Sequence, residues 1–279
     1  MALTAAAVVV ALVASGTAAW VLLHRKGSAS FNSSQPYPTT AVASTAHSVA
    51  QQQSRAAQLM TGWWRAHGAQ EDDQGFAQWL RQNFPRPPAR ATRAHEAASL
   101  MNLAKSRTSS GIAAAQYLDD HGADDIWKTY AQRLSTSGQG PGTTEMDDLT
   151  DFAGQVAGDL QTQDAALSPY VILPALRTDK PAAASGGDCV CSYPSTHATD
   201  SAAAREYLTF FDPHSVAYVN MEAQVDYSRL YVAGPVPSDI TARALLGDMI
   251  GEYFLVTRDS WPRACIRQLG LRRFRLGVA

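Results

Sequence analysis

The chain has 279 residues, of which 46% are hydrophobic, and its formal net charge at pH 7 is −2. This length and composition suffice for one sizeable buried core. A net charge so close to zero gives no overall attraction for nucleic acid, so we expect no nucleic-acid partner. The sequence also lacks a metal-ligand motif, and we expect neither a metal nor another cofactor.

The three cysteines, Cys189, Cys191 and Cys265, are too few for a disulfide framework. The Cys-Val-Cys spacing matches neither a redox pair nor a zinc site. Two interpretations stay open. Either Cys189 or Cys191 forms one bridge to Cys265 in an exported domain, or the cysteines are buried free thiols.

The chain begins with an apolar segment at residues 2–23 that carries no charge and ends at His24-Arg25-Lys26. At a rise of 1.5 Å per residue, a helix of this length crosses a hydrocarbon core of ~30 Å. A cleavable signal peptide would have its positive charge before a shorter apolar run. Residues 1–26 are therefore predicted to be a membrane anchor. Basic residues directly after the anchor favour a cytoplasmic position for the rest of the chain.

Residues 27–46 are mainly Ser, Thr, Pro and Ala with almost no charge. Such a segment offers little apolar surface to bury, and we expect a flexible stalk. Residues 47–279 then form the main domain.

Apolar residues in this domain recur at the spacing of one helix face, and no segment has the alternation of a strand. The stripes of Trp and Leu are expected in the core rather than at a cofactor. The fold class is therefore all-α. The expected helices are 47–67, 74–84, 92–105, 111–120, 124–134, 145–165, 197–211, 215–229 and 238–256.

Two short stretches, 192–197 and 228–239, carry the residues of greatest chemical interest. The first predicts a turn that opens a helix, because a proline fixes φ and Ser195 or Thr196 can cap the first N–H groups. The second predicts the end of a helix at Arg229, a Gly-Pro loop and the start of another helix. Together they would bring a histidine, an arginine and helix N-terminal amides to one point, which suits phosphate.

These stretches resemble the superfamily of type 2 phosphatidic acid phosphatases, bacterial acid phosphatases and vanadium haloperoxidases. The second sequence block of that family is Pro-Ser-Gly-His, and Pro194-Ser195-Thr196-His197 is similar to it. The third block is Ser-Arg, five residues, His, three residues and Asp. Residues 228–239 keep this spacing but have Pro235 in place of the histidine.

The first block of the family is a Lys followed seven residues on by Arg-Pro. Here Lys180-Pro181 resembles the Arg-Pro pair, and Leu173 stands at the lysine position. The resemblance covers about residues 165–258. It implies a helical bundle of the acid phosphatase and haloperoxidase type, here carried by one N-terminal transmembrane helix.

The resemblance also implies roles for six residues. Arg229 and Lys180 would clamp a phosphate group, and the Ser195 hydroxyl and the Thr196 amide would donate hydrogen bonds to it. His197 would act as the acid, and Asp239 would orient the nucleophile.

Three of these residues also have a structural interpretation. Arg229 ends a helix, where a cation meets the negative end of the dipole. Asp239 lies in the first turn of a helix beside Ser238, where a carboxylate is favourable, and Ser195 can simply be a cap. His197 fits a structural role less well, because a cationic imidazole in the first turn meets the positive end of the dipole.

Pro235 replaces the nucleophile with a residue that has no reactive side chain. Loss of a covalent nucleophile costs as much as ~10⁶ in rate. The first expected function is therefore binding of phosphate, or of a phosphorylated small molecule or lipid, with impaired catalysis. An active metal-independent phosphomonoesterase, with His197 as acid and a substitute nucleophile, is the alternative. A purely structural membrane-tethered protein is a third.

The resemblance also bears on location. The expected protein is single-pass and membrane-bound. Members of the family with a soluble domain usually work outside the cytoplasm, which opposes the charge rule and favours the exocytoplasmic side.

Overall fold

The computed structural model describes residues 32–46, 49–138, 140–178 and 190–258. All regular secondary structure within these ranges is helical, which confirms the all-α prediction. One isolated bridge, between Leu167 and Cys191, joins extended residues there. Of the helices in these ranges, none combines the length and the apolar character needed to cross a membrane. The predicted anchor lies outside the described residues.

Eight of the nine predicted helices agree with the observed bounds to within two residues, and the exception lies at residues 92–105. The helices at Thr39–Ala46 and Pro169–Ile172 were not predicted. In chain order the observed helices are α2 (Thr39–Ala46), α3 (Val49–His67), α4 (Asp73–Asn83), α5 (Arg90–Ser99), α6 (Met101–Lys105), α7 (Ser109–His121), α8 (Asp125–Thr136), α9 (Thr143–Asp164), α10 (Pro169–Ile172), the 3₁₀ turn η1 (Pro174–Leu176), α11 (Thr196–Phe211), α12 (Val216–Tyr231) and α13 (Pro237–Thr257).

The exception is a break at Leu100, which divides the predicted helix into α5 and α6. The Leu100 N–H donates to the Ala97 carbonyl at 3.1 Å, a bond one residue shorter than in an α-helix. Leu100 is buried in a small apolar cluster with Leu176 and Val236, which come from distant parts of the chain. Tertiary packing at this point therefore overrides the local helical pattern.

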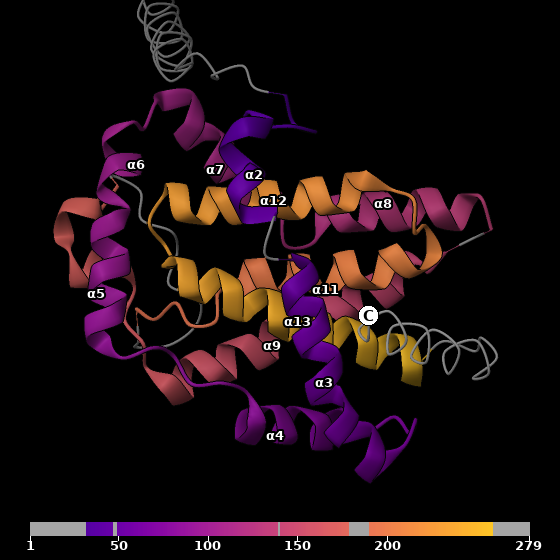
Figure 1. Ribbon diagram of the computed structural model, residues 1–279. Coiled ribbons are helices and arrows are strands. Elements are labelled where there is room, and N and C mark those ends of the chain that lie inside the picture. Colours follow the sequence, from indigo (N-terminus) through magenta and orange to yellow (C-terminus); the bar gives the residue numbers. More distant parts are fainter. Residues whose placement is uncertain (1–31, 47–48, 139, 179–189, 259–279) are drawn as a thin grey trace, which may run out of the picture. The chain divides into compact units, whose positions relative to one another are not determined.

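Helices α11, α12 and α13 lie at the centre of the fold, with α9 against α11 and α3 crossing α13 (Figure 1). The contact between α11 and α13 is the most extensive and is very close. A Cβ atom on Gly247 of α13 would lie 2.7 Å from both the Ala203 nitrogen and the Thr199 oxygen of α11. The alanine-rich face of α11 and the glycine of α13 thus let the two backbones approach closely.

An aromatic cluster joins α3, α4, α9 and α13. Trp63 and Phe76 are fully buried, and their ring centroids lie 5.0 Å apart. Phe76 also stacks on Tyr253 of α13 at 4.2 Å and on Phe152 of α9 at 6.3 Å. The Trp stripe is core, as predicted.

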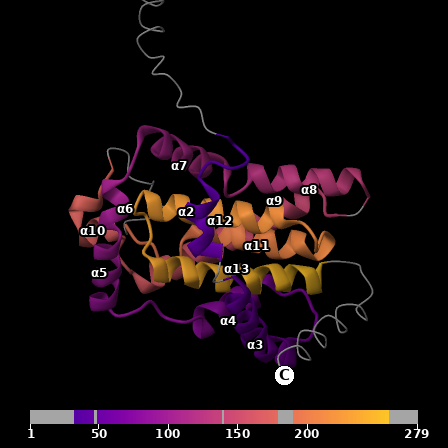
Figure 2. The ribbon, with the colours of Figure 1, turned by 45° about the horizontal axis from the view of Figure 1, so that its top comes forward.

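The flexible stalk expected at residues 27–46 is wrong for its described part, residues 32–46. Helix α2 packs across α12, and α7 contacts α12 as well (Figure 2). Tyr37 just before α2 is 4% exposed, and its hydroxyl donates to the Gly111 carbonyl of α7 at 2.8 Å. Its ring meets Tyr227 edge-on, with the centroids 4.9 Å apart.

A single buried side chain, Gln224 of α12, satisfies both backbone groups of Tyr37. The Tyr37 N–H donates to Gln224 Oε1 at 2.7 Å, and Gln224 Nε2 donates to the Tyr37 carbonyl at 2.9 Å. The average composition of residues 27–46 predicted a stalk, because it does not reveal the individual contacts of Tyr37. The burial of Tyr37 and its hydrogen bonds with Gln224 dock a segment that has little apolar surface of its own.

Replacing Gln224 with Leu is expected to release residues 32–46 from α12. Both backbone groups of Tyr37 would lose a buried partner, at a cost of about 1–3 kcal/mol each, and the segment would gain hydration by leaving. Hydrogen–deuterium exchange of the α2 amides should become faster by at least tenfold. Exchange unchanged from the wild type would show that Gln224 does not hold the segment.

Candidate functional site

The start of α11 places His197 in the first helical turn. Ser195 is the N-cap residue, with its backbone extended at φ −72° and ψ 122°, and its carbonyl accepts the first helical hydrogen bond from Thr199 at 2.9 Å. The Ser195 side chain makes no capping hydrogen bond, so its predicted role as a cap is not realised. Gln161 of α9 holds the preceding loop by donating to the Pro194 carbonyl at 2.6 Å.

His197 and Arg229 converge on one atom, Oδ1 of Asp119. The His197 Nε2 atom lies 3.4 Å from this oxygen, and Arg229 donates a hydrogen bond to it from Nη1. The three residues come from the start of α11, the last turn of α12 and the last turn of α7. The side chains of His197 and Asp119 are 32% and 27% exposed, whereas that of Arg229 is 6% exposed. The site therefore opens to solvent on the side of the histidine and the carboxylate.

Asp119 was not among the residues predicted from the sequence. It lies with Asp120 near the C-terminal end of α7, where the helix dipole disfavours a carboxylate. Two adjacent acidic residues at such a position are a usable signal, because they indicate that cations from elsewhere compensate them. Arg229, 110 residues further along the chain, supplies that cation.

Burial lowers the pKa of His197 below its ordinary value of 6.5, and the neighbouring Arg229 lowers it further. The carboxylates of Asp119 and Asp120 raise the pKa of His197, but their effect is smaller than that of burial and Arg229. The imidazole is therefore neutral at pH 7 in the unliganded site. A bound anion would counter the charge of Arg229 and raise the pKa of His197 again.

Asp239 lies in a second, separate group of polar residues. It forms a buried ion pair with Arg93 of α5, accepts a hydrogen bond from Ser192 Oγ at 2.7 Å and accepts another from the Val236 N–H at 3.0 Å. Within the described residues, the carboxylate of Asp239 bonds to these partners and not to His197 or Arg229. This geometry agrees with the structural interpretation of Asp239 at the start of α13, and it leaves no free carboxylate to orient a nucleophile.

The remaining predicted positions are Lys180, Leu173, Pro235 and Thr196. Lys180 lies outside the described residues. Leu173, at the lysine position of the first block, packs against the apolar cluster around Leu176. Pro235 is buried in the loop between α12 and α13, and Thr196 is the first residue of α11.

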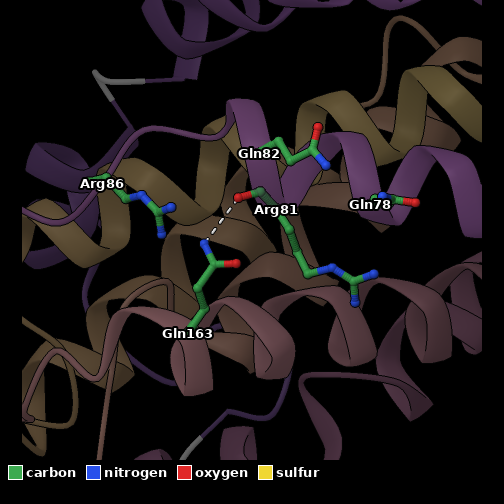
Figure 3. Close-up of a pocket in the computed structure, with 5 residues that line it drawn as sticks. All are labelled: Gln78, Arg81, Gln82, Arg86 and Gln163. Atoms are coloured by element: carbon green, nitrogen blue, oxygen red, sulfur yellow. Dashed lines mark hydrogen bonds between the residues drawn. The ribbon is translucent and has the colours of Figure 1, made fainter.

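A pocket of about 530 Å³ lies elsewhere, between α4 and α9 (Figure 3). Its lining is polar throughout and consists of Gln78, Arg81, Gln82, Arg86 and Gln163. Arg81 pairs with Asp159, and Arg86 pairs with Asp164. Because acidic partners already neutralise both guanidinium groups, the pocket has no strong attraction for an anion, and no predicted site residue lines it.

No protein-family model matches the chain, and a search of curated proteins found no match. The site is therefore judged on its own geometry. A guanidinium group and an imidazole that meet at one carboxylate oxygen can equally meet at one oxygen of a phosphate group. Such a pair of groups can bind and polarise an anion.

Proposed function

We propose that this protein binds phosphate, or a phosphorylated small molecule or lipid, at His197 and Arg229, and that it turns the ligand over slowly or not at all. The observation that carries the proposal is the meeting of both side chains at Asp119 Oδ1. In this proposal Asp119 is an internal anion that occupies the ligand position while the site is empty. The chain would be a degenerate relative of the acid phosphatase and haloperoxidase superfamily.

The charges of the site support such an exchange of anions. Arg229 is 6% exposed, and a buried guanidinium group needs an anionic partner in either state. The Asp119 side chain is 27% exposed, so its carboxylate can rotate into water when a ligand arrives. A phosphate group offers more oxygen acceptors than a carboxylate, and the planar fork of Arg229 suits it well.

Two features argue for binding rather than hydrolysis. Pro235 supplies no nucleophile, and Asp239 is fully engaged by Arg93 and Ser192. In addition, the lowered pKa of His197 leaves the imidazole neutral at pH 7, which is the wrong state for a general acid.

One contact favours the alternative, an active phosphomonoesterase with His197 as acid. The carboxylate of Asp119 beside His197 forms the kind of pair that can hold a protonated imidazole once a phosphate dianion is bound. In that case water or another side chain would have to replace the missing nucleophile. Hydrolysis of an aryl phosphate at pH 5–7 that is lost in the His197→Ala variant would favour this enzyme over the binding protein.

The location of the protein is part of the proposal. Residues 2–23 would anchor the chain in a membrane, with the helical domain on the exocytoplasmic side. Cys191 is disulfide-bonded, and its partner, Cys189 or Cys265, lies outside the described residues. Disulfides persist mainly in oxidising compartments, so this bond supports the exocytoplasmic side over the cytoplasmic one.

Replacing Asp119 with Asn should increase the affinity for inorganic phosphate and vanadate by about tenfold, because it removes the competing negative charge from the ligand position. Titration calorimetry on the full chain in a mild detergent would measure this change. The Arg229→Met variant should lose binding altogether. Asp120→Asn is the matched control, since it removes the same charge one residue away and makes no contact with Arg229. Absence of phosphate and vanadate binding in both the wild type and the Asp119→Asn variant would contradict the proposal.

A further inference from the structure

A second cluster of charged side chains is buried at the centre of the fold, between α11, α12 and α13. It has no part in the proposed anion site. Each member is at most 4% exposed. We call this cluster the ionic core; its members are Arg205 and Glu206 of α11, Glu222 and Asp226 of α12, and Arg243 and Asp248 of α13.

Arg205 connects all three helices. Its Nε donates to Glu222 at 2.8 Å, one terminal nitrogen donates to Glu206 at 2.6 Å, and the other forms an ion pair with Asp248. Glu206 also accepts a hydrogen bond from Gln53 of α3 at 2.8 Å. One guanidinium group therefore contacts three carboxyl groups on three helices.

Arg243 makes the second set of contacts. It donates to Glu222 Oε1 at 2.7 Å and to the Ala198 carbonyl at 3.2 Å, and it forms an ion pair with Asp226. Glu222 is thus shared by both arginines, with one oxygen bound to each. Both oxygens of Glu222 therefore have a guanidinium partner.

The charges of the ionic core do not balance. Two guanidinium groups face four carboxyl groups, which leaves an excess of two negative charges if every carboxyl is ionised. An uncompensated buried charge costs several kcal/mol, so groups in this position take up protons instead. The described residues contain no cluster of His, Cys, Asp and Glu side chains able to hold a metal ion. Protons bound to the carboxyl groups would reduce this excess.

Asp248 is the first candidate to hold a proton, because its cation, Arg205, also contacts Glu206 and Glu222. Its Oδ1 pairs with Arg205, but its Oδ2 is buried and has no hydrogen-bond partner. Both Asp226 oxygens also lack a hydrogen-bond partner. Asp226 is the second candidate, because its ion-pair partner Arg243 contacts one other carboxyl group among the described residues, Glu222. An ionised carboxylate needs partners for both oxygens, whereas a neutral carboxyl group tolerates this environment better.

We propose that Asp248 is protonated in the folded protein and that the ionic core acts as a pH-sensitive lock between α11, α12 and α13. The lock is closed while the core holds its proton. Loss of the proton as the pH rises leaves unbalanced negative charge at the place where the three helices meet. The close packing of α11, α12 and α13, which is the closed state of the lock, is therefore favoured in mildly acidic surroundings.

The electrostatics of Asp248 agree with this geometry. Burial raises its pKa well above the ordinary value of 3.8, Glu206 and Glu222 raise it further, and Arg205 opposes them. A carboxyl group whose pKa is raised in the folded state stabilises the fold fully below its unfolded pKa. That contribution is lost as the pH rises through the folded pKa. The protein should therefore be more stable at pH 5 than at pH 8.

A second buried carboxyl, Asp200 of α11, lies outside the ionic core. Its raised pKa also makes the fold less stable as the pH rises. Burial is the main cause of its raised pKa, and Asp124 and Asp151 add to it. His197 has the opposite tendency, because its pKa is lowered and protonation below pH 6.5 disfavours the fold. Only a comparison of variants can therefore assign the pH dependence to Asp248.

The experiment is thermal unfolding of the full chain in a mild detergent between pH 5 and pH 8. Wild-type Tm should fall with rising pH by about 3–5 °C per pH unit for each proton lost. Asp248→Asn keeps the shape of a protonated carboxyl but cannot release a proton. The fall of its Tm with pH should therefore be smaller than that of the wild type by about 3–5 °C per pH unit. Its Tm at pH 8 should equal or exceed that of the wild type. Asp148→Asn, an exposed carboxylate of α9, is the matched control and should leave the slope unchanged.

Two outcomes would overturn the proposal. The first is a wild-type Tm that does not fall between pH 5 and pH 8. The second is an Asp248→Asn variant with the full wild-type slope. If that variant does not fold, unfolding of the Asp200→Asn variant at pH 7 in two buffers of different ionisation enthalpy gives the number of protons released without the contribution of Asp200. Release of one or more supports the lock, and release of none contradicts it.

Discussion

Replacing Arg205 with Met is expected to lower the free energy of unfolding by about 3–5 kcal/mol at pH 7. The substitution removes one guanidinium group and leaves Glu206, Glu222 and Asp248 facing one another in a site that water does not reach. Urea denaturation followed by circular dichroism at 222 nm would measure the loss. At pH 5 the loss should be smaller, because the carboxyl groups left behind can take up protons.

Arg81→Met is the control for the Arg205 variant. Arg81 also pairs with a carboxylate, Asp159, but the two side chains are 38% and 39% exposed. Surface pairs of this kind contribute about 0–1 kcal/mol. Equal losses in the two variants would show that the ionic core contributes no more than a surface ion pair.

The second large effect is expected where α13 meets α11. Gly247→Ala should destabilise the protein by about 1–3 kcal/mol, because the added Cβ would lie 2.7 Å from backbone atoms of Thr199 and Ala203 and 2.4 Å from the Ala202 Cβ. Backbone atoms inside a helix cannot move aside as a flexible side chain can. The two central helices would have to separate, which also opens contacts further along both.

The same substitution at Gly158 should have the opposite sign. Gly158 lies within α9, and a Cβ there would meet no atom within 4 Å. Ala is favoured over Gly in a helix by about 0.5–1 kcal/mol, so Gly158→Ala should stabilise the protein by that amount. Chemical denaturation of both variants tests the pair. A stabilised Gly247→Ala variant would show that α11 and α13 lie further apart than described.

The site was partly predictable from the sequence. The pair His197 and Arg229 was expected to share one anion position, and the two side chains do meet at one point. The carboxylate of Asp119 that they share was missed, as was Arg93, the partner of Asp239. Arg93 offered a signal as well, because it shares a helix face with the buried Ala97, and a buried arginine needs an acidic partner.

The sequence by itself determined most of the long helices, the buried Trp stripe and the absence of a nucleophile at Pro235. These features depend on side-chain identity or on the 3.6-residue repeat, both of which are local. Only the tertiary structure decided which charges meet. The Asp119–Arg229 pair and the Arg205–Asp248 pair join residues 110 and 43 positions apart. The docking of residues 32–46 likewise depends on Gln224, which is 187 positions from Tyr37. No local pattern specifies such pairs, because their energy comes from burial, and burial exists only once the helices have assembled.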